Sequence, residues 1–164
     1  MADSPIFTGL CDVLRRQGWK FTRVDGREVV ELAFGGRCGT IPIHAQAFEA
    51  IGALGFTAEA MHPTGLDYRA KLAELLMRVN VQMTVGNFEM DWDGPRVYFR
   101  VVNLFDGAPP GDRLVAGMVH ATVAETDRMM ALMRALGECP VAGLAAFDIS
   151  RLLRREDLFP DEPA

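Results

Sequence analysis

Two runs of alternating residues surround an Asp93-Gly94 pair, and they constrain the fold more than any other part of the chain. Asp-Gly is typical of the tight turn of a β-hairpin. In both arms apolar residues alternate with mostly polar ones, and the apolar positions are Phe88, Met90, Trp92, Val97, Phe99 and Val101. A period of two gives a strand one apolar and one polar face. The pattern therefore predicts an antiparallel sheet whose apolar face is covered by another layer.

Three helices are predicted to supply that layer. The first begins at Ser4 and Pro5, which suit the N-cap and the first helical position, and it ends at Gly18. The second spans about 67–80 and the third about 112–136. Along the third, apolar or small residues recur at steps that alternate between four and three: Val115, Val119, Thr122, Thr126, Met129, Met133 and Leu136. Such a seam is typical of a helix that packs along a core or against a second helix.

Further strands are predicted before the second helix. Residues 19–24 and 28–34 flank an Asp-Gly pair at 25–26, which again indicates a hairpin. Residues 40–45 place apolar side chains on one face. Pro42 has no N–H to donate to a neighbouring strand, so this strand is predicted to lie at a sheet edge or to contain a bulge.

Residues 46–60 allow two interpretations. The composition of the first part favours a helix by propensity. Gly52 and Gly55 disfavour a long helix, and a strand around 50–57 is the preferred prediction.

Residues that could carry out catalysis are few and scattered. Ser4 is explained as a helix cap, and Ser150 lies outside any Gly-x-Ser-x-Gly turn. The histidines and cysteines show no metal-ligand or disulfide spacing: His44, His62, His120, Cys11, Cys38 and Cys139. Folding could still assemble a metal site from distant ligands. The chain is nevertheless predicted to be no enzyme and to hold no metal or cofactor.

Charge and hydropathy exclude two classes of partner. The formal net charge is −5 and the isoelectric point is about 5.2, whereas a protein that binds nucleic acid normally presents a basic face. No apolar run reaches the roughly 18 residues that span a bilayer. The N-terminal residues lack a basic region followed by an apolar one, so the expected location is the cytoplasm.

From Leu72 to Leu136 the chain resembles the YbjN-domain family of bacterial sensory transduction regulators. The residues that carry the resemblance are a helix ending in Asn80, the run Val85-Gly86-Asn87-Phe88-Glu89-Met90-Asp91, the Asp93-Gly94 turn, Val97-Tyr98-Phe99-Arg100 and the final long helix. The resemblance implies an α+β fold with the order α-β-β-β-α-β-β-α. It also implies a fold similar to type III secretion chaperones, which are small, acidic, usually dimeric proteins that hold partner segments. Pro95 and a longer tail depart from the family pattern.

The domain organisation expected from these observations is simple. Residues 1–137 are predicted to form one YbjN-like α+β domain, in which an antiparallel sheet packs against helices. Residues 138–164 are predicted to form a C-terminal extension that is partly packed and then continues as a mobile acidic tail.

The favoured function is a non-catalytic protein–protein interaction module, chaperone-like or regulatory, that acts as a homodimer and binds an unidentified protein. Methionine is common on adaptable binding surfaces and is also a filler of cores. The predicted partner or dimer contacts on the last helix are Met118, Thr122, Met129, Met130 and Met133. The alternative function is a small-molecule-sensing regulatory domain with its ligand between helix and sheet, contacted by Tyr98, Arg100 and His120.

Overall fold

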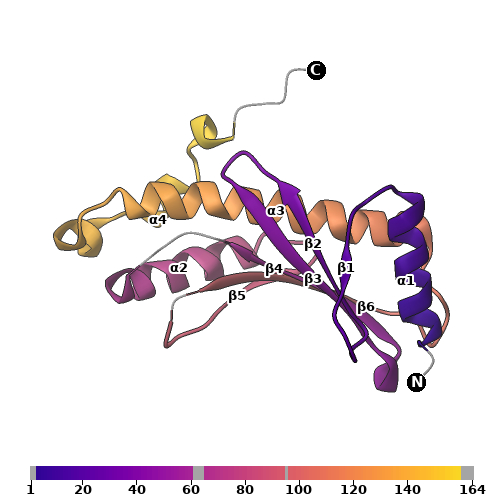
Figure 1. Ribbon diagram of the computed structural model, residues 1–164. Helices are drawn as coiled ribbons and strands as arrows, with labels where there is room; N and C mark the ends of the chain where they lie inside the picture. The colour runs from indigo at the N-terminus through magenta and orange to yellow at the C-terminus, as the bar shows by residue number, and fades with distance from the viewer. Residues whose placement is uncertain (1–2, 61–64, 95, 160–164) are drawn as a thin grey trace.

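The computed structural model describes residues 3–60, 65–94 and 96–159. Six strands form one antiparallel sheet in the order β1-β2-β3-β4-β6-β5 (Figure 1). Their bounds are β1 (Thr22–Arg23), β2 (Val29–Gly35), β3 (Thr40–Phe48), β4 (Ala53–Ala60), β5 (Asn87–Met90) and β6 (Val97–Leu104). The predicted antiparallel α+β fold is therefore confirmed. The strand predicted at 19–24 is reduced to the two-residue β1, which pairs with β2 as the hairpin prediction requires.

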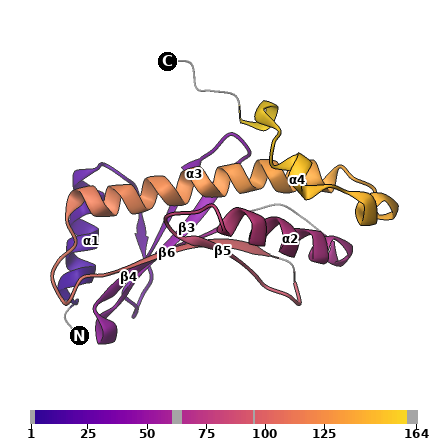
Figure 2. The same ribbon diagram turned by 180° about the vertical axis from the view of Figure 1, so that it is seen from behind.

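The helices form a second layer. They are α1 (Pro5–Arg16), α2 (Arg69–Asn80), α3 (Asp112–Gly137) and the short α4 (Ile149–Leu152). Figures 1 and 2 show α3 running along one face of the sheet, with α2 beside it over β5 and α1 across the other end. Short 3-10 turns complete the chain at Glu49–Ile51, Leu66–Tyr68, Val141–Ala146 and Glu156–Leu158. Ser4 caps α1 as predicted, because its hydroxyl accepts a hydrogen bond from the amide of Phe7.

The register of the sheet sorts side chains into two faces. Ala58 on β4 lies opposite Phe99 on β6, and Phe56 lies opposite Val101. All four side chains are buried and share the face on which the helices lie. Neighbouring residues point the other way because successive side chains of a strand alternate. The other face therefore carries polar, partly exposed side chains such as Arg100.

The ambiguous segment 46–60 is extended, as preferred. β3 continues through Phe48, a 3-10 turn follows, and β4 begins at Ala53. Gly52 makes this turn possible because it adopts a positive φ of 63°. β3 is an interior strand, in contrast to the predicted edge. Pro42 is tolerated there because the pairing of β3 with β4 begins one residue later, so no ladder bond to β4 is lost.

A buried carboxylate anchors the turn between β2 and β3 to α3. The side chain of Asp127 is only 9% exposed. It accepts hydrogen bonds from the amide of Cys38 and from Nε of Arg37, both at 3.0 Å. The paired charge explains how an acidic residue can lie on the buried side of the helix. This contact holds the turn against α3; Figure 1 shows the connection between β2 and β3 beside that helix.

The C-terminal extension packs on the domain through residue 152 at least. Leu144, Ile149 and Leu152 are buried. Nζ of Lys71 donates a hydrogen bond of 2.9 Å to the carbonyl of Phe147, which joins the extension to α2. The end of the predicted mobile tail, residues 160–164, lies outside the described residues, as does most of the predicted loop at 62–65.

Candidate interaction surface

The methionine seam of α3 lies inside the protein. Met118, Thr122, Met129, Met130 and Met133 are at most 3% exposed, so none of their side chains is available to another molecule. The seam packs in the core, where α3 contacts β3, β4 and β6 as well as α1 and α4. The predicted assignment of these residues to a contact surface is thus corrected, because they act as core filler. Any interaction surface has to be built from other residues.

The three residues proposed to hold a ligand are not brought together. Tyr98 and Arg100 project from β6 on the face away from the helices. There Nε of Arg100 contacts both carboxylate oxygens of Glu89, at 3.0 and 3.1 Å. His120 is exposed on α3, on the other side of the sheet, and its ring lies 5.8 Å from that of Trp19. A ligand between helix and sheet cannot touch all three.

The residues that carry the family resemblance build one corner of the fold. The side-chain amide of Asn80, at the end of α2, donates to the carbonyl of Phe88 at 3.0 Å and accepts from its amide at 2.8 Å. Asn80 thus supplies the two hydrogen bonds that a neighbouring strand would otherwise make with Phe88 at the outer edge of β5. Gly86 has a positive φ of 71° and lies directly against the ring of Phe99. These residues serve the structure and leave the β5 edge protected against added strands.

Asp91 stabilises the turn of the same hairpin, and its contribution depends on pH. The amides of Asp93 and Gly94, followed by Arg96, hold the pKa of the Asp91 carboxyl below its usual value. A depressed folded-state pKa stabilises the fold above the unfolded-state pKa of about 3.9, and the stabilisation is lost as the pH falls through the folded-state pKa.

We expect Asp91→Asn to be less stable than the wild type at pH 7, with a difference that shrinks at pH 3. Urea unfolding at both pH values measures it. Asp93→Asn is the control, because the Asp93 side chain accepts no hydrogen bond from the residues that the structure describes. Equal losses at both pH values would contradict this role of the charge.

An apolar stripe that is exposed to solvent runs along the outer side of α2, from the 3-10 turn before the helix to the residue that caps its end. Its residues are spaced by four, three, four and four positions: Leu66, Ala70, Ala73, Met77 and Val81. Leu66, Met77 and Val81 are 55%, 65% and 83% exposed. The stripe lies opposite the buried side of α2, which consists of Leu72, Leu75, Leu76 and Val79. Contiguous exposed apolar side chains mark interaction sites.

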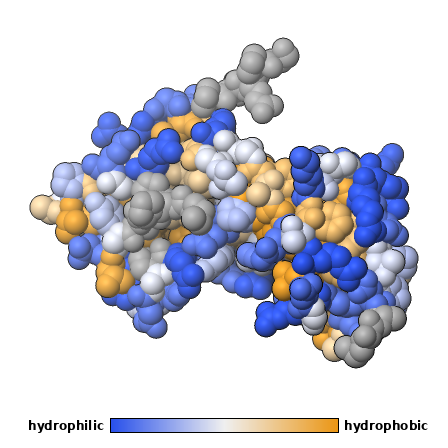
Figure 3. All heavy atoms as spheres, in the orientation of Figure 1, coloured by the Kyte–Doolittle hydropathy of each residue, from blue (hydrophilic) through white to orange (hydrophobic). Residues whose placement is uncertain are grey.

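Sequence reasoning missed this stripe because charged residues separate its apolar positions along the chain. Arg69, Lys71, Glu74 and Arg78 are interleaved with the apolar positions. A second apolar series at helical spacing was the available signal. Figure 3 shows hydrophobic side chains at the end of the molecule formed by the start of α2 and residues 141–146, with hydrophilic ones around them.

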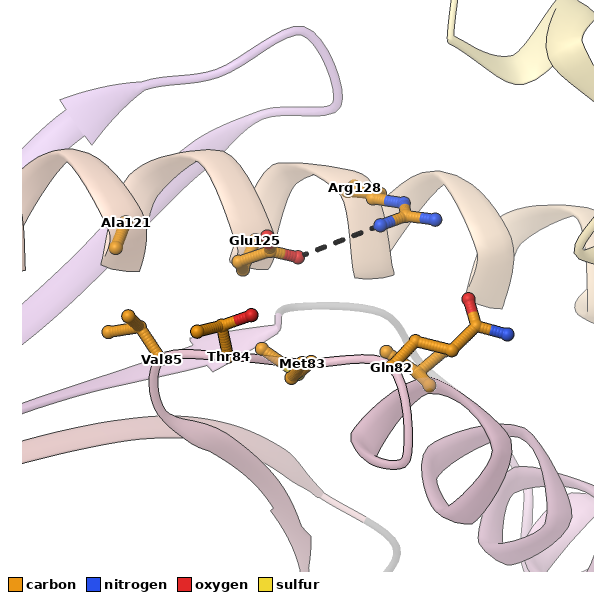
Figure 4. Close-up of a pocket in the computed structure, with 8 residues that line it drawn as sticks. Gln82, Met83, Thr84, Val85, Ala121, Glu125 and Arg128 are labelled. Atoms are coloured by element: carbon orange, nitrogen blue, oxygen red, sulfur yellow. Dashed lines mark ion pairs between the residues drawn. The ribbon is translucent and has the colours of Figure 1, made fainter.

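A separate hollow lies between α3 and the loop that follows α2. It encloses about 270 Å³ and is lined by Val79, Gln82, Met83, Thr84, Val85, Ala121, Glu125 and Arg128. Figure 4 shows the side chains of α3 facing those of the loop across this space. Within the residues described, no group of histidine, cysteine and carboxylate side chains could hold a metal ion. No described helix is both long and apolar enough to cross a bilayer.

Comparison with known proteins identifies one family and one fold. The YbjN family model, described as "Putative bacterial sensory transduction regulator", matches residues 8–131. The crystal structure of YbjN from E. coli is similar to this chain with a TM-score of 0.57 at 14% sequence identity. The likeness covers 76% of this chain and 87% of that one, and it concerns the fold alone. No curated protein matches the chain in sequence.

Proposed function

The chain belongs to the YbjN family, and from this premise we propose that it is a non-catalytic regulatory module that acts as a homodimer and binds a second protein. The observation that carries the homodimer is the exposed stripe on α2. The family is described as a regulator, which acts through another molecule. The three cysteines are free thiols, which fits the reducing conditions of the cytoplasm as the proposed location.

The stripe is complementary to itself when two copies of α2 meet antiparallel. A twofold axis between Ala73 and Glu74 pairs each residue with one whose number adds to 147, so that Ala73 lies beside Glu74 of the partner subunit. Leu66 then meets Val81 of the partner subunit, and Ala70 meets Met77 of the partner subunit. Met77 thus lies against a small alanine of the partner subunit, and Leu66 lies against the valine at the other end of the partner's stripe. The two helices can therefore interdigitate. A twofold interface requires this kind of self-complementarity.

The centre of the stripe allows close approach. Ala70 and Ala73 carry only methyl groups, so the two helix backbones can approach closely there while the larger residues pack around them. The charged neighbours are already partnered within the helix, since Glu74 contacts Nζ of Lys71 at 3.1 Å and Arg78 at 2.9 Å. Lys71, Glu74 and Arg78 therefore already have partners of opposite charge beside the stripe.

Substitution Met77→Glu tests this interface. Two glutamates would be buried without partners in each dimer, at a cost of about 1–3 kcal/mol each. We expect the dissociation constant of the dimer to rise by about 100-fold, the equivalent of about 3 kcal/mol. Analytical ultracentrifugation of both proteins measures this change.

Leu114→Glu is the matched control. Leu114 lies in the first turn of α3 and is 45% exposed, but it is outside the stripe. The control variant should associate like the wild type. If Met77→Glu associates as tightly as Leu114→Glu while both remain folded by circular dichroism, the α2 interface is refuted.

A further inference from the structure

The hollow between α3 and residues 82–85 has an apolar end and a charged end. Figure 4 shows Ala121 and Val85 together on one side, and Arg128 with Gln82 on the other. Glu125 and Thr84 face each other between these two ends. The walls come from a long helix and from a loop held between α2 and β5, which are both anchored in the fold. A ligand with one apolar end and one charged end would be complementary to this hollow.

At the charged end, one carboxylate oxygen of Glu125 could accept a hydrogen bond that no described residue donates. Oε2 of Glu125 is shielded from solvent and accepts no hydrogen bond from any residue that the structure describes. It forms a long ion pair with Nη1 of Arg128 at 4.0 Å, drawn as a dashed line in Figure 4, and this distance is too great for a hydrogen bond. The Glu125 side chain as a whole is 32% exposed, so this oxygen carries only part of the cost of a buried acceptor without a donor. A bound group that donates to Glu125 would remove this cost.

Arg128 is held in place for a second contact. Its guanidinium lies 5.3 Å from the centre of the Phe159 ring, in a cation–π contact with the C-terminal extension. A guanidinium presents paired N–H donors that match a carboxylate. The hollow thus presents a shielded acceptor and an oriented cationic donor side by side, followed by an apolar end.

We infer that this hollow binds a small zwitterion with an apolar body, of which an apolar α-amino acid is the simplest example. The ligand's ammonium group donates to Glu125, and its carboxylate accepts from Arg128. Its apolar side chain lies against Val85 and Ala121. A volume of about 270 Å³ is below the roughly 300–1,000 Å³ of pockets for drug-sized ligands, which fits a molecule of this size.

Isothermal titration calorimetry with L-leucine, isopentylamine and 4-methylpentanoate tests the inference. The last two probes each keep the apolar body and lack one of the charges. We expect L-leucine to bind at least tenfold more tightly than either probe. Equal affinity for the amine and the amino acid would overturn the role of Arg128, and the absence of binding by L-leucine and by the other apolar amino acids would overturn the inference.

Charge-removing variants locate the site. Glu125→Gln and Arg128→Gln should each weaken L-leucine binding at least tenfold. The controls Glu138→Gln and Arg134→Gln make the same chemical changes at exposed positions near the end of α3, outside the hollow, and should leave binding unchanged. Equal effects of all four variants would place the ligand elsewhere.

An amide NMR titration of the wild-type protein gives a readout that does not depend on any variant being folded. The shifts induced by L-leucine should centre on residues 82–85 and 121–128. Shifts centred on another part of the chain would refute the site. The inference does not depend on the homodimer, because binding and association are measured separately.

Discussion

Substitution Gly86→Ala is expected to lower the free energy of unfolding by about 2–6 kcal/mol, enough to unfold a domain of ordinary stability. Gly86 has a φ of 71°, a conformation that strains any residue with a Cβ. An added Cβ would also lie 2.8 Å from Cε2 of Phe99 and from the carbonyl oxygen of Arg100. Phe99 is fully buried and Arg100 contributes backbone, so neither atom can move away cheaply. Urea or thermal unfolding followed by circular dichroism measures the loss.

Gly26→Ala separates the two causes. Gly26 has a similar φ of 69°, but an added Cβ would meet nothing within 4 Å. The control should therefore lose only the conformational part, about 1–2 kcal/mol. If both variants lose the same stability, the close approach of Gly86 to Phe99 has no energetic role.

Substitution Asn80→Ala is expected to cost about 2–4 kcal/mol, because it leaves the amide and the carbonyl of Phe88 without partners at about 1–3 kcal/mol for each group. The loss should be local as well as global. Amide hydrogen exchange of Phe88 should accelerate more than that of residues in β3, because β5 is joined to the sheet on one side only.

Two further variants control this prediction. Asn87→Ala removes an exposed amide that makes only a 3.4 Å contact with Glu89, and it should change stability by less than about 0.5 kcal/mol. Asn80→Asp keeps the acceptor for the Phe88 amide and loses the donor, so its effect should lie between those of Asn87→Ala and Asn80→Ala. An Asn80→Ala protein as stable as the Asn87→Ala protein would show that the edge of β5 does not need this cap.

The sequence was sufficient to predict the sheet and its helical layer because local patterns determine them. Alternation around Asp93-Gly94 correctly predicts the burial of Phe88, Val97, Phe99 and Val101, and the structure places Phe88 opposite Phe99 as that pattern requires. The prediction was wrong for Trp92, which lies beyond the end of β5 and is 55% exposed. The motif that contains Asn80 was identified by its resemblance to the YbjN family and not by alternation. The role of Asn80 could be recognised only in the structure, where its side chain bonds the backbone of Phe88 at the edge of β5.

The interaction surface could not be predicted in the same way, because burial depends on where a helix lies in the fold. Both α2 and α3 carry apolar seams at helical spacing. α3 lies over the middle of the sheet, so Met129 and Met133 are covered, whereas the outer side of α2 faces solvent at the end of the layer. Similarly, Tyr98 and His120 lie on opposite sides of the sheet, a relation that follows from topology and not from spacing.

The hollow beside Glu125 could not be predicted from the sequence either. Its two walls are about 40 residues apart in the chain, and Glu125 and Arg128 resemble an ordinary ion pair within one helix turn. Only the position of the 82–85 loop turns them into the charged end of a cavity.

Sedimentation equilibrium of the wild-type protein over a concentration series tests the proposed self-association through α2 most directly. We expect a molar mass twice that of the 18.0 kDa chain at high concentration. On dilution, Met77→Glu should dissociate into monomers at a much higher protein concentration than the wild type. A mass of one chain at every concentration, in a protein that is folded by circular dichroism, would contradict the homodimer.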